Sequence, residues 1–345
     1  EIESLGGAIG PSAGADLFNW GVGVPRQHFA RSLDLLADAA LAPVFAADEV
    51  ERERTVALSD LEQLRDDMAR YPMRLLFSAA FGEHPYGTSI ETVESSLRAL
   101  VRDDVVRWHQ ERVLNGEPWV FIVGDVDPDE AAREVEQRLA VVRAVPATDR
   151  VGAPAWPAAP VTTTAARDKA QTALAIGFPG VSRNAPEYQP LQLLSAAIAG
   201  LGGPLFEELR SRRSLAYSVA AYPVARLLGG AFVGYIGTSP EREDEAREGL
   251  IAELLRWTRE ELDPAELVRA KRYTIGTWHI RSQTNGAQLA NLTTAFLLGE
   301  GLDEIREFES RVAGITAPQI REAAEACFDP ARLVTAIVRG TGKAR

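Results

Sequence analysis

The sequence predicts an α+β fold made of two homologous domains, each with a mainly antiparallel sheet packed against helices. Three observations lead to this prediction. The chain has 345 residues, 46% hydrophobic and 25% charged, which is typical of a globular protein with room for two domains. A weak internal repeat relates its two halves. In the second half, strand patterns follow one another before a series of long helices.

The repeat is clearest near the end of each half. When the sequence is shifted against itself by 215 positions, Leu100–Asp125 aligns with Ile315–Gly340 without a gap. Each copy has the apolar spacing of a helix, followed by a short apolar run. The pattern therefore predicts a helix and then a buried strand in both copies, the strands covering Trp119–Val123 and Leu333–Val338.

A second match, at a shift of 217 positions, places Ala46–Arg54 over Asp263–Lys271. Both segments begin with acidic residues after a short break, as helix starts do. If the second domain begins near Val161, the same shift puts the start of the first domain about 55 residues before Glu1. We therefore expect the first domain to lack its N-terminal part in this sequence.

The join between the domains is a proline-rich segment. Val145–Pro160 contains four prolines, which predicts an extended and fairly stiff linker. The predicted domains are thus residues 1–144 and 161–345, with the linker at 145–160.

Alternating and continuous apolar runs predict the elements of the second domain. Two strands come first, then two helices separated by a glycine-rich turn, then two further strands and a series of helices. In order, these elements cover Val161–Ala165, Thr172–Phe178, about Pro186–Ala199, a helix ending near Arg213, Leu215–Val224, Ala231–Gly237 and helices from Glu241 onward.

Composition excludes several classes of function. The net charge of −12 repels a phosphate backbone, so nucleic acid and an anionic membrane surface are not expected partners. No apolar run is long enough to span a membrane. The single cysteine, Cys327, excludes an internal disulfide and a thiolate metal cluster, and its helical setting predicts a buried thiol.

Five segments, in this order, resemble the insulinase/pitrilysin family of zinc peptidases. The family's metal motif is the inverted H-x-x-E-H. The resemblance extends over essentially the whole chain, and it implies that this polypeptide is one half of a clam-shell peptidase that closes around an unfolded peptide. The segments that carry it are Glu1–Gly7, Leu33–Val56, His84–Gly87, Val120–Asp127 and Leu205–Val219.

The zinc site implied by the resemblance is not present in this sequence. The four histidines are His28, His84, His109 and His279, and none of them belongs to an H-x-x-E-H motif. The family's third ligand is a glutamate, and its position here is Asp60, whose carboxylate is one methylene shorter. That shortening exceeds the tolerance of a zinc bond, so Asp60 is a degenerate ligand position. The histidine motif would lie before Glu1.

A second departure also favours a non-catalytic member. Active relatives have an asparagine and alanine pair before the strand that flanks the substrate, whereas this chain has Gly10 and Pro11. The turn at His84–Gly87 is predicted to be structural, with Pro85 and Gly87 setting the backbone.

The family's substrate-binding pair is present. Family members hold the bound peptide near the cleaved carbonyl with an arginine and a tyrosine seven residues apart, supplied by the half opposite the zinc. The matching residues are Arg210 and Tyr217. A guanidinium and a phenol are both donors that can stabilise a carbonyl oxygen as it becomes negative. Alternatively, Arg210 is an exposed helix cation and Tyr217 a half-buried strand aromatic.

Three functions remain open from the sequence. The first is a non-catalytic, substrate-positioning subunit of a heterodimeric zinc metalloendopeptidase. Its partners would be an extended peptide and a catalytic subunit, or a second copy, that carries H-x-x-E-H and the zinc; this chain itself binds no cofactor. The second is a catalytic zinc peptidase truncated here, with Asp60 ligating at a stretch or replaced by Glu62 or a water. The third is a structural or assembly subunit without peptidase activity.

In each case an extended peptide would be recognised by strand addition to a sheet edge. The alanine- and arginine-rich composition points to a bacterial source. The compartment stays open, with the analogy favouring the periplasm over the cytoplasm.

Overall fold

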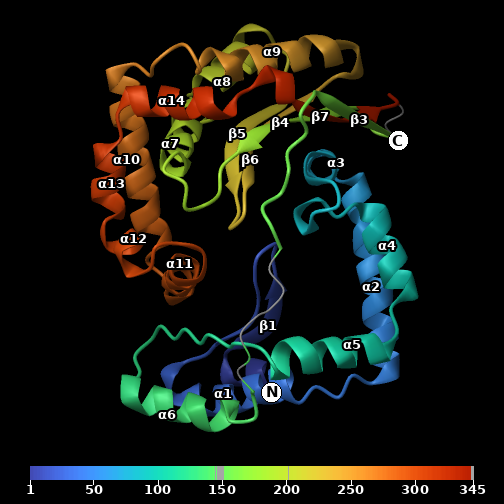
Figure 1. Ribbon diagram of the computed structural model, residues 1–345, viewed down its shortest axis with the longest axis vertical. Coiled ribbons are helices and arrows are strands. Elements are labelled where there is room, and N and C mark those ends of the chain that lie inside the picture. The colour runs from blue at the N-terminus through green and yellow to red at the C-terminus, as the bar shows by residue number, and fades with distance from the viewer. Residues whose placement is uncertain (144, 146–150, 201, 343–345) are drawn as a thin grey trace. The chain divides into compact units, whose positions relative to one another are not determined.

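The computed structural model describes residues 1–143, 145, 151–200 and 202–342 (Figure 1). Contacts divide the chain into two compact units. Unit 1 comprises Glu1–Ser59, Glu94–Val151 and Ser282–Thr293, and unit 2 comprises Asp60–Val93, Gly152–Arg281 and Thr294–Arg345. Each unit is therefore assembled from segments that are distant in the sequence.

Unit 1 is mainly helical and contains one two-stranded antiparallel hairpin. The apolar face of α1 packs on the hairpin and on α6, and Arg138 of α6 donates to Asp34 of α1 at 2.8 Å. The elements of this unit are η1 (Ile2–Leu5), β1 (Ala8–Ala13), β2 (Phe18–Gly23), η2 (Arg26–His28), α1 (Phe29–Leu41), the first part of α2 (Ala47–Asp66), most of α4 (Ile90–Ala99), α5 (Arg102–His109), η4 (Gln110–Leu114), α6 (Pro128–Leu139) and the first part of α11 (Asn285–Leu298).

Unit 2 is built on a five-stranded sheet with the order β3-β7-β4-β6-β5. The predicted strands of the second domain are all present, and four of the five strands pair antiparallel to a neighbour. The parallel pairing of β3 with β7 was not predicted. The strands are β3 (Val161–Arg167), β4 (Thr172–Gly180), β5 (Ser218–Ala225), β6 (Gly230–Thr238) and β7 (Val334–Gly340).

Most helices of unit 2 lie in the second half of the chain, as predicted. They are α3 (Arg70–Phe81), η3 (Pro85–Gly87), α7 (Tyr188–Ile198), α8 (Pro204–Phe206), η5 (Glu207–Arg212), η6 (Pro240–Arg242), α9 (Glu243–Arg256), α10 (Pro264–Arg281), α12 (Leu302–Arg306), α13 (Phe308–Gly314), α14 (Ala317–Cys327) and η7 (Pro330–Arg332).

Helices cover both faces of this sheet, so its central strands are buried (Figure 1). One face packs Phe178 and Phe232 against α7, α9 and α14 in the larger core cluster. The other face packs Ala175 and Val233 against α3. Burying apolar strand faces on both sides explains the nearly continuous apolar sequences of β4, β6 and β7.

Helix α3 fits against β4 because that strand has a glycine at the point of contact. Leu76 of α3 is fully buried. A Cβ at Gly177 would lie 3.0 Å from both terminal methyl carbons of Leu76. Glycine at 177 therefore lets the helix approach the sheet closely.

The positions of the helices confirm the internal repeat. Helix α2 begins at Ala47 and α10 at Pro264, which is the predicted shift of 217. Helix α5 begins at Arg102 and α14 at Ala317, which is the predicted shift of 215. These two helices thus recur in the same order in both halves of the chain.

The two hairpins are also repeat equivalents. In the first hairpin the Gly14 N–H donates to the Leu17 carbonyl and closes the turn. In the second hairpin the Arg226 N–H donates to the Gly229 carbonyl, so donor and acceptor both lie 212 positions after their counterparts. The same shift places Pro11, opposite Trp20, onto Pro223, opposite Phe232. Each outer strand therefore carries a proline at the same position.

One predicted strand is not formed. Residues 119–123 adopt no regular structure, and Trp119 is 59% exposed. The repeat counterpart of this segment is β7, which is held between β3 and β4. Of the described residues, none forms a strand beside 119–123. The prediction was wrong here because an apolar run becomes a strand only when a neighbouring strand accepts its hydrogen bonds.

The linker prediction lies partly outside the described residues, since 146–150 are not described; residues 151–160 have no helix or strand. The domain limits at 144 and 161 stay predictions. No helix in the described part of the chain has the length and apolar character to cross a membrane.

Candidate functional site

The predicted peptide-binding pair lies on a tightly bonded segment that leads into the outer strand β5. Pro204 occupies the first turn of α8, which continues into the π-helical turn η5. The end of this helix is closed by Ser214, which has a positive φ of 51°. Leu215 N–H donates to the Leu209 carbonyl at 2.7 Å, and both side chains are buried. The segment between Arg210 and Tyr217 is therefore anchored by its apolar residues.

Arg210 is an exposed cation on η5. Its guanidinium carbon lies 4.9 Å from the centre of the Phe206 ring. The next two arginines are ion-paired: Arg212 approaches Glu207 and Glu208 at 3.4 Å, and Arg213 approaches Glu245 at 3.3 Å. Within the described residues Arg210 has no carboxylate partner, so its donors face solvent.

Tyr217 stands directly before β5. Its backbone N–H donates to the Gly237 carbonyl at 2.8 Å, which fixes the start of the strand on β6. The side chain is 56% exposed. This exposed fraction, at a residue that leads directly into β5, fits both a ligand-binding donor and the alternative of a half-buried aromatic at the strand.

Arg210 and Tyr217 thus share one anchored segment and are both exposed, and both are hydrogen-bond donors. An exposed guanidinium with no carboxylate to neutralise it can bind a carbonyl or carboxylate oxygen. The buried residues between them hold the backbone, so the two side chains are free to serve a ligand without weakening the core.

The residues implied as metal ligands do not form a metal site. Asp60 is an exposed residue of α2. Among the residues that the structure describes, no group of three histidine, cysteine or acidic side chains could hold a metal ion. The residues present therefore do not fit the zinc that the resemblance implies.

Each of the four histidines contacts another group of the fold: His28 lies 3.4 Å from the Gln27 amide nitrogen, and His279 pairs with Glu309 at 2.8 Å. His109 is 6% exposed, and its Nε2 lies 2.7 Å from the Ala40 carbonyl. His84 Nδ1 accepts from the N–H of Tyr86, whose ring is buried. The predicted structural turn at His84–Gly87 is confirmed as η3.

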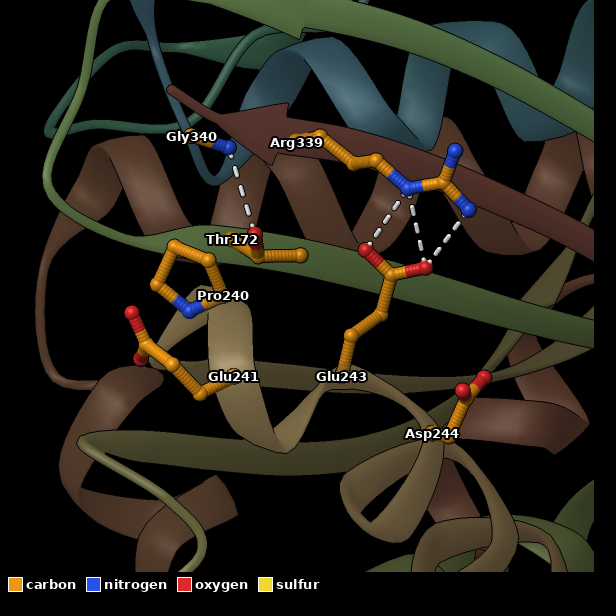
Figure 2. Close-up of a pocket in the computed structure, with 7 residues that line it drawn as sticks. All are labelled: Thr172, Pro240, Glu241, Glu243, Asp244, Arg339 and Gly340. Atoms are coloured by element: carbon orange, nitrogen blue, oxygen red, sulfur yellow. Dashed lines mark hydrogen bonds and ion pairs between the residues drawn. The ribbon is translucent and has the colours of Figure 1, made fainter. Parts of the chain in front are cut away.

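A small polar pocket lies elsewhere in unit 2, at the ends of β4 and β7 (Figure 2). Its volume is about 270 Å³. Arg339 donates to both carboxylate oxygens of Glu243, with the shortest distance 2.7 Å, and Gly340 N–H donates to the Thr172 hydroxyl. The lining residues are Thr172, Pro240, Glu241, Glu243, Asp244, Arg339 and Gly340.

Sequence reasoning did not find this pocket, because its residues come from three segments that the fold brings together. The Arg339 guanidinium neutralises Glu243, and Asp244 pairs with Arg247 at 2.9 Å. The third carboxylate of the pocket, Glu241, has no cationic partner in the described chain. The pocket therefore carries one uncompensated negative charge. Arg210 and Tyr217 do not line it.

Comparison with known families identifies the fold. Residues 99–274 match the family described as peptidase M16 inactive domain, and residues 1–93 match insulinase (peptidase family M16). The first match alone covers more than half of the chain. The chain belongs to the M16, or insulinase, peptidase family. The larger of the two matches, over residues 99–274, is to the M16 domain described as inactive.

Curated relatives of this M16 chain are longer bacterial proteins. An uncharacterized zinc protease of Mycobacterium tuberculosis is 31% identical over 215 residues, which are 61% of this chain and 49% of the relative. An uncharacterized zinc protease of Streptomyces coelicolor is 22% identical over 94% of this chain and 72% of its own length. The chain spans about half the length of the mycobacterial relatives.

Solved structures share the fold. The peptidase M16 inactive domain from Pseudomonas fluorescens has a TM-score of 0.89 at 21% identity, covering 99% of this chain and 82% of that chain. A protease from Helicobacter pylori has a TM-score of 0.87 at 17% identity, covering 98% and 83%. These similarities establish the α+β architecture of an M16 half.

Proposed function

We propose that this M16 chain is the non-catalytic, substrate-positioning subunit of a heterodimeric zinc metallopeptidase that degrades unfolded peptides. The zinc would belong to a catalytic partner that carries H-x-x-E-H. In this assignment the Arg210 guanidinium and the Tyr217 hydroxyl donate hydrogen bonds to backbone carbonyl oxygens of the peptide, close to the bond that the partner cleaves.

The observation that carries the proposal is the state of Arg210. The next two arginines along the chain, Arg212 and Arg213, are ion-paired, whereas Arg210 has only a ring contact within the described residues. An exposed guanidinium without a carboxylate is available for a ligand, and Tyr217 on the same anchored segment supplies a second donor. The match of residues 99–274 to the inactive M16 domain supports a role without zinc.

The proposal is tested by replacing each donor in the assembled peptidase. Arg210→Ala and Tyr217→Phe are compared with wild type after mixing with the catalytic subunit, using a fluorogenic unfolded peptide. Each variant should lower kcat/KM by about tenfold or more, because each removes a hydrogen bond to the reacting carbonyl. The thermal midpoint should stay unchanged, since both side chains are exposed.

Arg212→Ala is the matched control for charge, because it removes the same cation from the same helix but breaks only exposed ion pairs. Tyr222→Phe is the control for the phenol. Unchanged cleavage by Arg210→Ala and Tyr217→Phe would contradict the proposal. Loss of folding or assembly instead of turnover would favour a structural subunit.

A second candidate rests on the relatives. They are named zinc proteases, and the mycobacterial ones are about twice as long as the part matched here. The alternative is that the longer protein is itself catalytic, with its histidines in a segment before Glu1. Metal analysis of the full-length protein decides between them: one tightly bound zinc per chain supports the alternative, and none supports the positioning subunit.

A further inference from the structure

Strand β3 has an open edge at Thr162 and Thr164, whose outward backbone groups have no partner in the described chain; at the end of the strand the outward Ala166 carbonyl accepts from the Arg167 guanidinium at 3.2 Å. Its pairing to β7 is fixed at both ends, because Val161 N–H donates to the Leu333 carbonyl and Thr341 N–H donates to the Arg167 carbonyl. In a parallel pair, alternate residues bond to the neighbour. The odd-numbered residues therefore bond to β7, and Thr162, Thr164 and Ala166 point their N–H groups outward.

Nothing on the strand blocks pairing at Thr162 and Thr164. The three outward residues are exposed and have small neutral side chains. The strand contains no proline, and its first charged residue is Arg167, at the end. Unprotected edges of this kind are templates for another strand.

The outer strands of the two hairpins are protected. The hydrogen bonds that close the two turns set which facing residues bond to each other along each hairpin. By this alternation, Pro11–Trp20 and Pro223–Phe232 are non-hydrogen-bonded pairs. Each proline therefore removes an outward N–H without costing a bond of its own hairpin. On β5 the outward carbonyl of Ala221 also accepts from the Ser195 hydroxyl at 2.7 Å.

The edge of β2 that faces away from β1 carries no proline, but the equivalent edge in the second half of the repeat is already paired with another strand. In unit 2 the matching edge of β6 carries β4 over the whole strand. In the five-stranded sheet, β3 is therefore the open edge, and β5, which carries Pro223, is the protected edge.

We infer that the outer edge of β3 binds an extended peptide by strand addition. The outward N–H and C=O groups of Thr162 and Thr164 would pair with the peptide backbone, and the small side chains would impose little sequence selectivity. A neutral or basic peptide fits better than a second copy of this chain, because each copy carries a net charge of −12 and two copies would repel. The inference rests on the proposed handling of peptides, but it uses neither Arg210 nor Tyr217.

The inference is tested by closing the edge as the hairpins are closed. Thr164→Pro removes an outward N–H that β7 does not use, and Thr164→Val is the matched control that keeps it. The probe is a short fluorescein-labelled peptide of alternating threonine and valine with a lysine at each end. Its binding is measured by fluorescence anisotropy. Wild type and Thr164→Val should bind it equally, and Thr164→Pro should bind about tenfold more weakly because the hydrogen bond from the Thr164 N–H to the peptide is lost.

A second arm leaves the protein unchanged, so it does not depend on whether the proline variant folds. The same peptide, N-methylated at alternate residues on the pairing edge, should not bind wild type. Equal binding of the methylated and unmethylated peptides, or wild-type affinity in a folded Thr164→Pro, would overturn the inference. If sedimentation shows a wild-type dimer that becomes monomeric in Thr164→Pro, the edge belongs to a second copy instead.

The Arg210→Ala variant separates this inference from the proposed function. Reduced turnover with retained probe binding means that the two sites are independent and both assignments stand. Retained turnover with edge-dependent binding overturns only the role of Arg210. Loss of edge dependence with reduced turnover overturns only the role of β3.

Discussion

At the scale of single residues, the partners of each arginine decide what it can do. Arg339 is held by Glu243, and Arg138 is held by Asp34 and Glu134, so these guanidiniums serve the fold. Salt bridges of this kind also leave little capacity for a ligand. Arg210 differs because its contact within the described chain is with a ring face, which leaves the N–H edges of the guanidinium free. The same contrast holds within one short segment, where Arg212 and Arg213 are ion-paired and Arg210 is a binding candidate.

The single thiol gives a prediction about pH. Burial, with a smaller contribution from the Glu187 carboxylate, raises the pKa of Cys327 from 9.0 to about 11. The unfolded thiol ionises first, so this residue lowers the stability of the fold as pH rises from 9 towards 11 and has no effect below 9. At pH 8 a thiol reagent should label Cys327 only on unfolding. In Cys327→Ala this loss of stability with pH should disappear, and rapid labelling of the native wild type would contradict the prediction.

A second prediction concerns the contact between α3 and β4. Leu76→Ala removes a fully buried side chain and should lower the free energy of unfolding by about 2–5 kcal/mol. Gly177→Ala adds a Cβ 3.0 Å from the Leu76 methyl carbons and should cost about 1–3 kcal/mol through overpacking. In the double variant the new methyl fills part of the space that leucine vacates, so the total should be clearly less than the sum. Urea unfolding measures all three, and strict additivity would show that the two sites do not touch.

At the scale of elements, the sequence predicted those whose bonding partners are close in the chain or whose apolar runs are buried on both sides. Strands β4 and β6 and helix α7 lie close to the predicted limits. The strand predicted at residues 119–123 is not formed, because a strand needs a neighbouring strand to bond to and hydropathy does not reveal one. The parallel pairing of β3 with β7 joins segments about 170 residues apart, and no local pattern encodes it.

The candidate site divides in the same way. Arg210 and Tyr217 could be named from the sequence because they lie seven residues apart in one recognisable segment. Arg210 has no carboxylate partner in the described chain, whereas Arg212 and Arg213 do. This difference depends on side-chain rotamers and on α9, which supplies Glu245. The pocket at Thr172 and Arg339, and the open edge of β3, arise only when distant strands meet.

The repeat itself makes a prediction about helix caps. Thr316 caps α14 by accepting from Gln319 N–H, and the Gln319 side chain accepts from Thr316 N–H in return. The equivalent cap of α5 is Val101, which offers no side-chain acceptor, although Asp104 still accepts from its N–H. Thr316→Ala should therefore lower the free energy of unfolding by about 1 kcal/mol, and Val101→Thr should raise it by a similar amount. Thermal unfolding with opposite shifts of the midpoint checks both, and shifts of the same sign would contradict the equivalence of the caps.

At the scale of the whole molecule, the stability of the backbone should differ between the two hairpins even though they are repeat equivalents. The β5–β6 hairpin belongs to a five-stranded sheet in which β6 is nearly fully buried. The β1–β2 hairpin forms a sheet of two strands whose residues are mostly exposed, and such hairpins are marginally stable. Amide hydrogen exchange should therefore be slow in β4, β6 and β7, with opening free energies close to that of global unfolding, and much faster in β1 and β2. Gly14 N–H and Arg226 N–H, which close the two turns at 2.7 and 2.9 Å, are the matched pair of amides for the comparison. Equal protection of these amides would mean that local hydrogen bonds, and not burial within the larger sheet, set the stability of each hairpin.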